Sequence, residues 1–220
     1  MKIDFNISQR PSILAASEAI STTISSCRMK LPADIPANTY VVDRNHTAYG
    51  SYAPSGLTGL GRVMPIIHPY IDNRIGIRGI DLGSGKGHAV FFLSLFGIKM
   101  DGVEADAELV DIAKTARLKL IDDYKGTPLG INFANTEFHQ KDLFKWPLNP
   151  YKLVYIYNPI FRNWEDHNFN KLIKKFDKEL SKGSIVIANL CWPDMKPWEK
   201  RRILADDQTL YEHNITVYRR

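Results

Sequence analysis

The sequence predicts an α/β protein with a doubly wound, mostly parallel seven-stranded sheet, helices on both faces and a final antiparallel strand. From residue 77 onward, apolar strand-like runs alternate with helical patterns of ten or more residues. This alternation favours parallel strands joined by helical crossovers. The last two strand-like runs are separated by only one or two residues, too few for a helix, so they must pair as an antiparallel hairpin.

The elements follow this order along the chain. A small-residue stretch with apolar spacing at 11–27 predicts a helix, which Pro32 and Pro36 prevent from continuing. An amphipathic pattern at 56–71 predicts a second helix, ended or kinked by Pro65. Later helices are predicted at 86–96, 107–124 and 166–180, and strands at 77–82, 99–104, 131–139, 153–157, 184–190, 209–212 and 214–218.

Length and composition predict one globular domain. At 220 residues, 44% hydrophobic and 24% charged, the chain is long enough to bury a core without help from disulfides or metals. We expect a catalytic domain at 46–220, preceded by a helical or irregular extension at 1–45. With no apolar run of about 20 residues and no signal peptide, we expect a cytoplasmic protein without membrane contact.

Charge and cysteine usage restrict the chemistry further. Cys27 and Cys191 are far apart, which excludes a zinc ribbon and disfavours a disulfide framework. We therefore expect no metal site. The net charge of +5 favours contact with phosphates or acidic partners only weakly.

The most informative segment is 79–88, which reads Gly-Ile-Asp-Leu-Gly-Ser-Gly-Lys-Gly-His. An apolar strand runs into a loop with glycine at every second position, and a helix follows. Glycines allow positive φ angles and close approach of a ligand. The free N–H groups at the following helix terminus favour a carboxylate or phosphate.

Two common nucleotide-binding patterns do not fit this loop. A phosphate-binding P-loop requires a glycine five positions before Gly85, where Ile80 stands, and Ser or Thr after Lys86, where Gly87 stands. A dinucleotide fingerprint requires its third glycine at position 88, which is His88. The remaining pattern is Asp-x-Gly-x-Gly-x-Gly.

That pattern resembles motif I of the class I, Rossmann-like S-adenosylmethionine-dependent methyltransferases. Downstream segments are similar to the motifs that follow it in this family: Gly-Val-Glu at 102–104, His-Gln-Lys-Asp-Leu-Phe at 139–144 and Tyr-Ile-Tyr-Asn-Pro at 155–159. The resemblance covers about three quarters of the chain. It implies a methyltransferase with S-adenosyl-L-methionine as cofactor, whose ribose hydroxyls bond to Glu104 and whose adenine amine bonds to Asp142. The implied cofactor-binding residues are Asp81, Gly83, Ser84, Gly85, Gly87, Glu104, Asp142, Leu143 and Asn158.

The same resemblance implies a catalytic group at the end of the fourth predicted strand. Methyl transfer mainly requires positioning of the nucleophile and exclusion of water. Asn158 can accept a hydrogen bond from an incoming amine, and Tyr157 and Phe161 can contact the acceptor. The base-methylating enzymes of the class carry two prolines after the Asp or Asn, whereas Ile160 follows Pro159 here.

The identity of the acceptor stays open at this level. The order of motifs is also similar, more faintly, to the seven-strand protein-lysine methyltransferases, which implies that Tyr49, Tyr52 and Thr58 belong to a segment over the cofactor. The acceptor is an amine or other nucleophile, either on a protein lysine or on a small molecule. The alternatives are an RNA or DNA base, or a cofactor-binding scaffold without catalysis. The oligomeric state is not predicted.

Overall fold

The computed structural model of the chain describes residues 10–27, 57, 60–61, 63–64, 67, 76–157, 167–189, 203–204 and 215–220. Its centre is a seven-stranded sheet in the order β3-β2-β1-β4-β5-β7-β6. The strands are β1 (Arg78–Leu82), β2 (Lys99–Glu104), β3 (Thr136–Gln140), β4 (Leu153–Tyr157), β5 (Ile185–Asn189), β6 (Ile203–Leu204) and β7 (Ile215–Arg219). Neighbouring strands from β3 to β5 are parallel, and β7 is antiparallel to both β5 and β6. The predicted sheet with a final antiparallel strand is confirmed.

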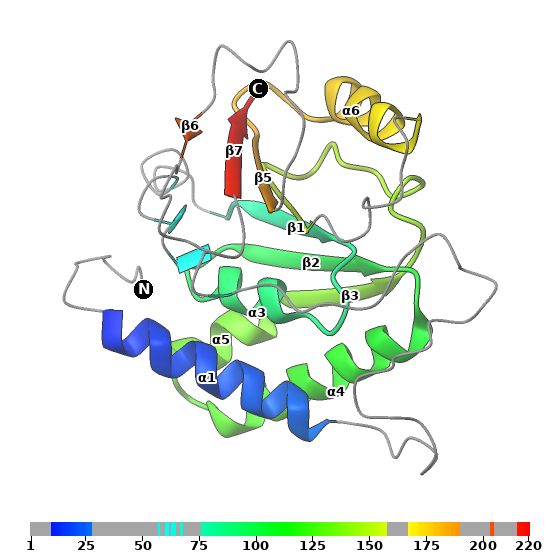
Figure 1. Cartoon of the computed structure of the whole chain (residues 1–220). Coiled ribbons are helices and arrows are strands. Elements are labelled where there is room, and N and C mark those ends of the chain that lie inside the picture. The colour runs from blue at the N-terminus through cyan, green and yellow to red at the C-terminus, as the bar shows by residue number, and fades with distance from the viewer. Residues whose placement is uncertain are drawn as a thin grey trace.

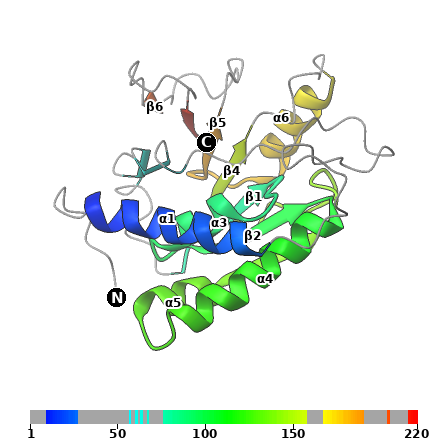
Figure 2. The same ribbon diagram turned by 60° about the horizontal axis from the view of Figure 1, so that its bottom comes forward.

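The helices lie on both faces of the sheet (Figure 1). On one face are α1 (Arg10–Ser26), α3 (His88–Ser94), α4 (Ala107–Asp123) and α5 (Pro128–Ala134), and on the other is α6 (His167–Glu179). Figure 2 shows α1 and α4 running side by side beneath the β2 side of the sheet. The predicted doubly wound arrangement is therefore confirmed.

Alternation along each strand divides the core into two layers. In β4, Tyr155 and Tyr157 belong to the core layer shared with α1, α3 and α4, whereas Val154 and Ile156 belong to the layer under α6. Strands buried on both faces are typical of a parallel sheet between helices. The apolar residues of the predicted helix at 56–71 are also buried in the first layer: Leu57, Leu60, Val63, Met64 and Ile67.

Local sequence signals explain where helices begin. The side chain of Asp106 accepts hydrogen bonds from the N–H groups of Glu108 and Leu109, so it is the N-cap of α4. Helix α3 begins at His88, two residues later than predicted, because Gly87 has a φ of 87° and precedes the helix as its N-cap. A left-handed residue cannot be part of a regular α-helix.

The predicted strand at 131–139 is wrong in its first half. Helix α5 occupies Pro128–Ala134, and β3 begins only at Thr136. Thr127 caps the helix by accepting a hydrogen bond from the N–H of Gly130, and Pro128 is its first residue. Threonine followed by proline is a helix-start signal, and it outweighs the strand-like apolar residues Ile131 and Phe133.

At the C-terminal end, the position of the hairpin differs from the prediction. The strand at 214–218 is confirmed as β7, but its outer partner is the short β6 at Ile203–Leu204. The predicted strand at 209–212 lies outside the described residues. Among the helices that the structure describes, none is long and apolar enough to cross a membrane.

Candidate functional site

The glycine loop joins β1 to α3 at the carboxyl end of the sheet. Three of its residues have positive φ angles: Gly83 at 80°, Gly85 at 51° and Gly87 at 87°. The N–H groups of Gly83 and Ser84 donate to the carbonyl of Val103 in β2, at 2.8 and 3.1 Å. The loop is therefore fastened to the neighbouring strand.

Two glycines are needed here because of close packing. A Cβ on Gly87 would lie 2.6 Å from the ring of Phe138, and a Cβ on Gly102 would lie 2.7 Å from Oγ of Ser84 and 2.8 Å from Phe138. Gly102 belongs to the Gly-Val-Glu motif, but the sequence does not show that it makes room for the glycine loop. Motif I and the end of β2 thus form one packed unit.

The Glu104 carboxylate connects the end of β2 to this loop. Its Oε2 accepts a hydrogen bond from the N–H of Gly85 at 2.9 Å, and its Oε1 accepts from the N–H groups of Ala105 and Asp106 at 2.7 and 3.1 Å. Burial raises the pKa of Glu104, and these backbone N–H groups oppose the rise. The carboxylate is thus oriented toward the glycine loop before any ligand binds.

Asp81 is the least satisfied charged group of the site. It is 2% exposed, and its Oδ1 has no hydrogen-bond partner among the described residues. Its pKa is raised well above its usual range, first by burial and then by the nearby Glu104. The buried Oγ of Ser84 is likewise without a hydrogen-bond partner in the described part of the chain. Buried unpaired polar atoms are rare in native proteins, so these two indicate a place for a polar ligand.

Two basic residues of the loop were not predicted as site residues. Lys86 is 6% exposed, and burial, with a smaller effect of Lys86, lowers the pKa of His88 to about 4. His88 is therefore neutral near pH 7. Lys86 places a positive charge beside a loop that also carries Asp81 and Glu104.

The loop after β3 reaches the same edge of the sheet. The N–H of Lys141 donates to the carbonyl of Glu104 at 2.9 Å, which brings Asp142 beyond the end of β2. Oδ1 of Asp142 accepts a hydrogen bond from the N–H of Phe144. The side chain of Leu143 is buried in the core layer under α6, so only its backbone faces the loop.

The ends of β4 and β5 differ in character from those of β1 and β2. Tyr157 lies beside Asn189 in the parallel register. Asn189 is fully buried, its Nδ2 donates to the Tyr155 hydroxyl at 3.3 Å, and its Oδ1 has no hydrogen-bond partner among the described residues. Asn158 and Phe161 lie outside the described residues. Sequence reasoning missed Asn189, since one Asn at a strand end has no distinguishing pattern.

The geometry fits a cofactor crossing the carboxyl ends of the strands. The strand order reverses between β1 and β4, and ligands of open α/β sheets bind where the order reverses. Asp81, the glycine loop and Glu104 lie on one side of this point, and Tyr157 and Asn189 on the other. The structure brings together the residues predicted from motifs I and II.

No protein-family model matches the chain. Over 143 residues it is 25% identical to a lysine N-methyltransferase of Caenorhabditis elegans that is named for ATP synthase, and the match covers 65% of this chain and 66% of that protein. The match thus spans slightly less than two thirds of the relative's length.

Among solved structures, the chain is similar to an RNA methyltransferase from Salinibacter ruber in complex with S-adenosyl-L-homocysteine. The TM-score is 0.52 at 23% identity, over 76% of this chain and 92% of that one. A weaker similarity, with a TM-score of 0.49 at 12% identity, relates it to the glycopeptide N-methyltransferase MtfA complexed with S-adenosylmethionine, over 77% of this chain and 68% of that one. The strand order, the glycine loop and the first of these structures together identify the chain as a protein with the class I, Rossmann-like S-adenosylmethionine-dependent methyltransferase fold.

Proposed function

We propose that this chain is an S-adenosylmethionine-dependent methyltransferase and that its acceptor is the ε-amine of a protein lysine. One observation carries the cofactor assignment: the Glu104 carboxylate is bonded to the glycine loop beside two unpaired buried atoms, Oδ1 of Asp81 and Oγ of Ser84. An acid at the end of the second strand, beside a glycine-rich turn, is the arrangement that binds a nucleoside ribose in Rossmann-like sheets.

The residues present fit this cofactor part by part. Glu104 is placed to accept hydrogen bonds from ribose hydroxyls, and the turn at Gly83 and Gly85 leaves room for the methionyl part. Asp142, in the loop that bonds to the end of β2, would receive the adenine amine. When bound, S-adenosylmethionine supplies an electrophilic methyl group on a sulfonium.

Two features support a lysine acceptor. The relative from Caenorhabditis elegans is a lysine N-methyltransferase by name. The ends of β4 and β5 carry neutral residues, since Tyr155 and Asn189 are buried there and Tyr157 is 8% exposed. An uncharged surrounding disfavours the ammonium form of an incoming lysine, and only the neutral amine has the lone pair that methyl transfer requires.

The protein's part in the transfer is positioning. Asn158 follows Tyr157 directly, and its side-chain oxygen would accept a hydrogen bond from the lysine amine. Tyr157 and Phe161 would hold the aliphatic stem of the lysine and keep water away. Such positioning accounts for a large part of the rate in a bimolecular displacement.

The experiment has two stages. The first is calorimetric titration of the pure chain with S-adenosylhomocysteine, with NAD as the control ligand. The second incubates the chain with S-adenosylmethionine labelled in its methyl group and with lysine peptides, mixed RNA or small amines, followed by hydrolysis and identification of the methylated product. We expect binding of S-adenosylhomocysteine alone and label recovered as ε-N-methyllysine.

The matched variant is Asn158→Ala. We expect it to retain affinity for S-adenosylhomocysteine while kcat falls by about 100-fold or more, a usual cost of losing a group that handles the reacting proton. Label in RNA or a small amine would overturn the lysine assignment but not the methyltransferase assignment. Absence of binding to S-adenosylhomocysteine would overturn both.

A further inference from the structure

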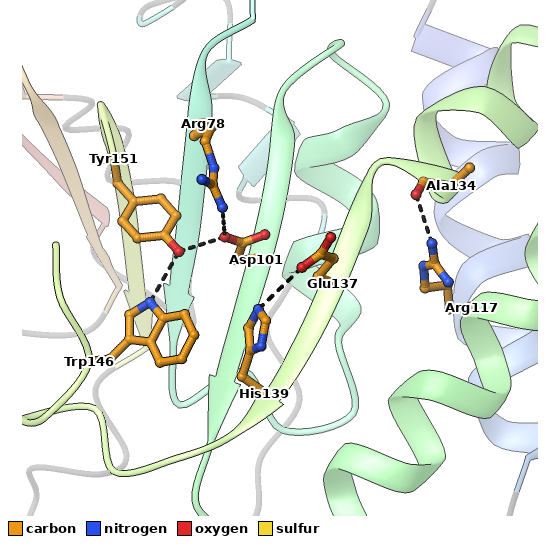
Figure 3. Close-up of polar contacts among 8 residues, drawn as sticks. All are labelled: Arg78, Asp101, Arg117, Ala134, Glu137, His139, Trp146 and Tyr151. Atoms are coloured by element: carbon orange, nitrogen blue, oxygen red, sulfur yellow. Dashed lines mark hydrogen bonds and ion pairs between the residues drawn. The ribbon is translucent and has the colours of Figure 1, made fainter. Parts of the chain in front are cut away.

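A cluster of three metal-binding side chains lies on the sheet outside the proposed methyltransferase site. Asp101 in β2 is directly beside Glu137 in β3, and His139 lies two residues further along β3 on the same face. One donor atom from each residue lies within 4.8 Å of the other two. Figure 3 shows the three side chains converging on the sheet surface.

The histidine of this cluster has an unused nitrogen. Nε2 of His139 exposes less than 1 Å² and has no hydrogen-bond partner among the described residues. It lies 3.7 Å from Oε2 of Glu137, which is too long for a hydrogen bond. Two ligands of a tetrahedral zinc ion are separated by about 3.3 Å, given bonds of about 2.0–2.1 Å. A shift of a few tenths of an ångström therefore converts this pair into two adjacent ligands.

The imidazole ring is held by an aromatic neighbour. The rings of His139 and Trp146 are stacked, with centroids 4.5 Å apart. The indole N–H of Trp146 donates to the hydroxyl of Tyr151 at 3.1 Å (Figure 3). Outer contacts of this kind fix the orientation of a metal ligand and strengthen binding.

The aspartate is oriented in the same way. Oδ2 of Asp101 accepts hydrogen bonds from the Tyr151 hydroxyl at 2.5 Å and from the Arg78 guanidinium at 2.7 Å. Burial and Asp101 raise the pKa of the Tyr151 phenol, so this hydroxyl remains a donor. Both bonds fall on Oδ2, which leaves Oδ1 to bind a cation.

The local charge favours one divalent ion. Two carboxylates and one guanidinium sum to −1 when the imidazole is neutral, and Glu137, 67% exposed, is free to move onto an incoming ion. Arg78 opposes a cation, but its side chain is 46% exposed, so water screens its charge. One imidazole nitrogen with two carboxylate oxygens suits zinc better than magnesium or calcium, which prefer oxygen ligands alone.

We propose that Asp101, Glu137 and His139 bind one zinc-class divalent cation, with water at the open coordination position. The ion would join β2 to β3 at the sheet edge and fix the start of the loop that contains Asp142. The proposal does not depend on the methyltransferase assignment.

The test uses the full chain without a histidine tag, stripped of metal with a chelator. Zinc is titrated by calorimetry, and cobalt is added as a visible-absorption probe of the ligand set. We expect one zinc per chain, a higher Tm with zinc, and binding weakened by at least about 10-fold in both His139→Ala and Glu137→Gln. Glu137→Gln alters an exposed side chain, so it remains informative if His139→Ala fails to fold.

Two control variants separate this site from other metal-binding groups. Glu108→Gln removes an acid on α4, and His213→Ala removes a histidine elsewhere in the sequence. We expect both to bind zinc like the unaltered chain, and His139→Ala to bind S-adenosylhomocysteine as before. Absence of zinc binding, or binding that survives His139→Ala and Glu137→Gln, would overturn the proposal.

Discussion

Two buried aspartates on adjacent strands have opposite surroundings. Asp101 in β2 is 4% exposed, and its carboxylate accepts hydrogen bonds from Arg78 and Tyr151. Asp81 in β1 is 2% exposed, has an oxygen without a partner among the described residues, and lies near the acidic Glu104. Because burial of a charge is costly unless it is paired, the first arrangement stabilises the fold and the second costs stability. A destabilised buried acid is typical of a functional site.

The largest effect is expected at Glu104, the acid that separates the surroundings of Asp81 from those of Asp101. Glu104→Ala should weaken S-adenosylhomocysteine binding by about 100-fold, because each hydrogen bond to a charged group contributes roughly 1.5–3 kcal/mol and two ribose hydroxyls lose their acceptor. Gly85→Val, at a φ of 51°, should weaken it similarly. Calorimetric titration measures both affinities, and circular dichroism checks that the variants fold. Unchanged affinity in both would remove the cofactor from this part of the sheet.

The next effect concerns the satisfied aspartate. Asp101→Asn should lower the free energy of unfolding by about 1–2 kcal/mol, because the charge that strengthens its hydrogen bonds to Arg78 and Tyr151 is lost. The value is modest because Arg78 is partly exposed. Urea unfolding in the presence of a chelator measures it without any metal contribution. A variant as stable as the unaltered chain would mean that this network does not stabilise the fold.

The smallest effect has the opposite sign. Burial and Glu104 raise the pKa of Asp81 above its usual 3.8, so the folded state holds that proton more tightly than the unfolded state does. The resulting stability is present below the usual pKa and is lost as the pH rises through the raised value. Asp81→Asn cannot ionise, so it should be more stable than the unaltered chain by about 1 kcal/mol at pH 8.

The pH dependence distinguishes this explanation from a simple packing change. Thermal unfolding of the two proteins should differ at pH 8 and converge near pH 4, where Asp81 is protonated in the folded state. An equal difference at both pH values would show that ionisation of Asp81 is not its source. Because ligand would mask the effect, the comparison is made without cofactor.

The comparison also shows how far sequence patterns reach. The glycine loop and Glu104 were predicted because strand, turn and helix follow one another within a short stretch, where glycine spacing and the final acid of a strand are visible. Asn189, Lys86 and the pairing of Asp101 with Tyr151 were not predicted. Asp101 and Tyr151 are 50 residues apart, and only the folded sheet brings them into contact.

The sequence by itself determined the α/β class, the final antiparallel strand and the cofactor loop, because these follow from local periodicity and from residues that permit positive φ angles. It did not determine where α5 ends and β3 begins, since an apolar run fits either element until a cap and tertiary packing choose between them. Only the tertiary structure decided which acid is paired and which is not. Pairing depends on which side chains of neighbouring strands share a face, and the β2–β3 register sets this for Asp101, Glu137 and His139.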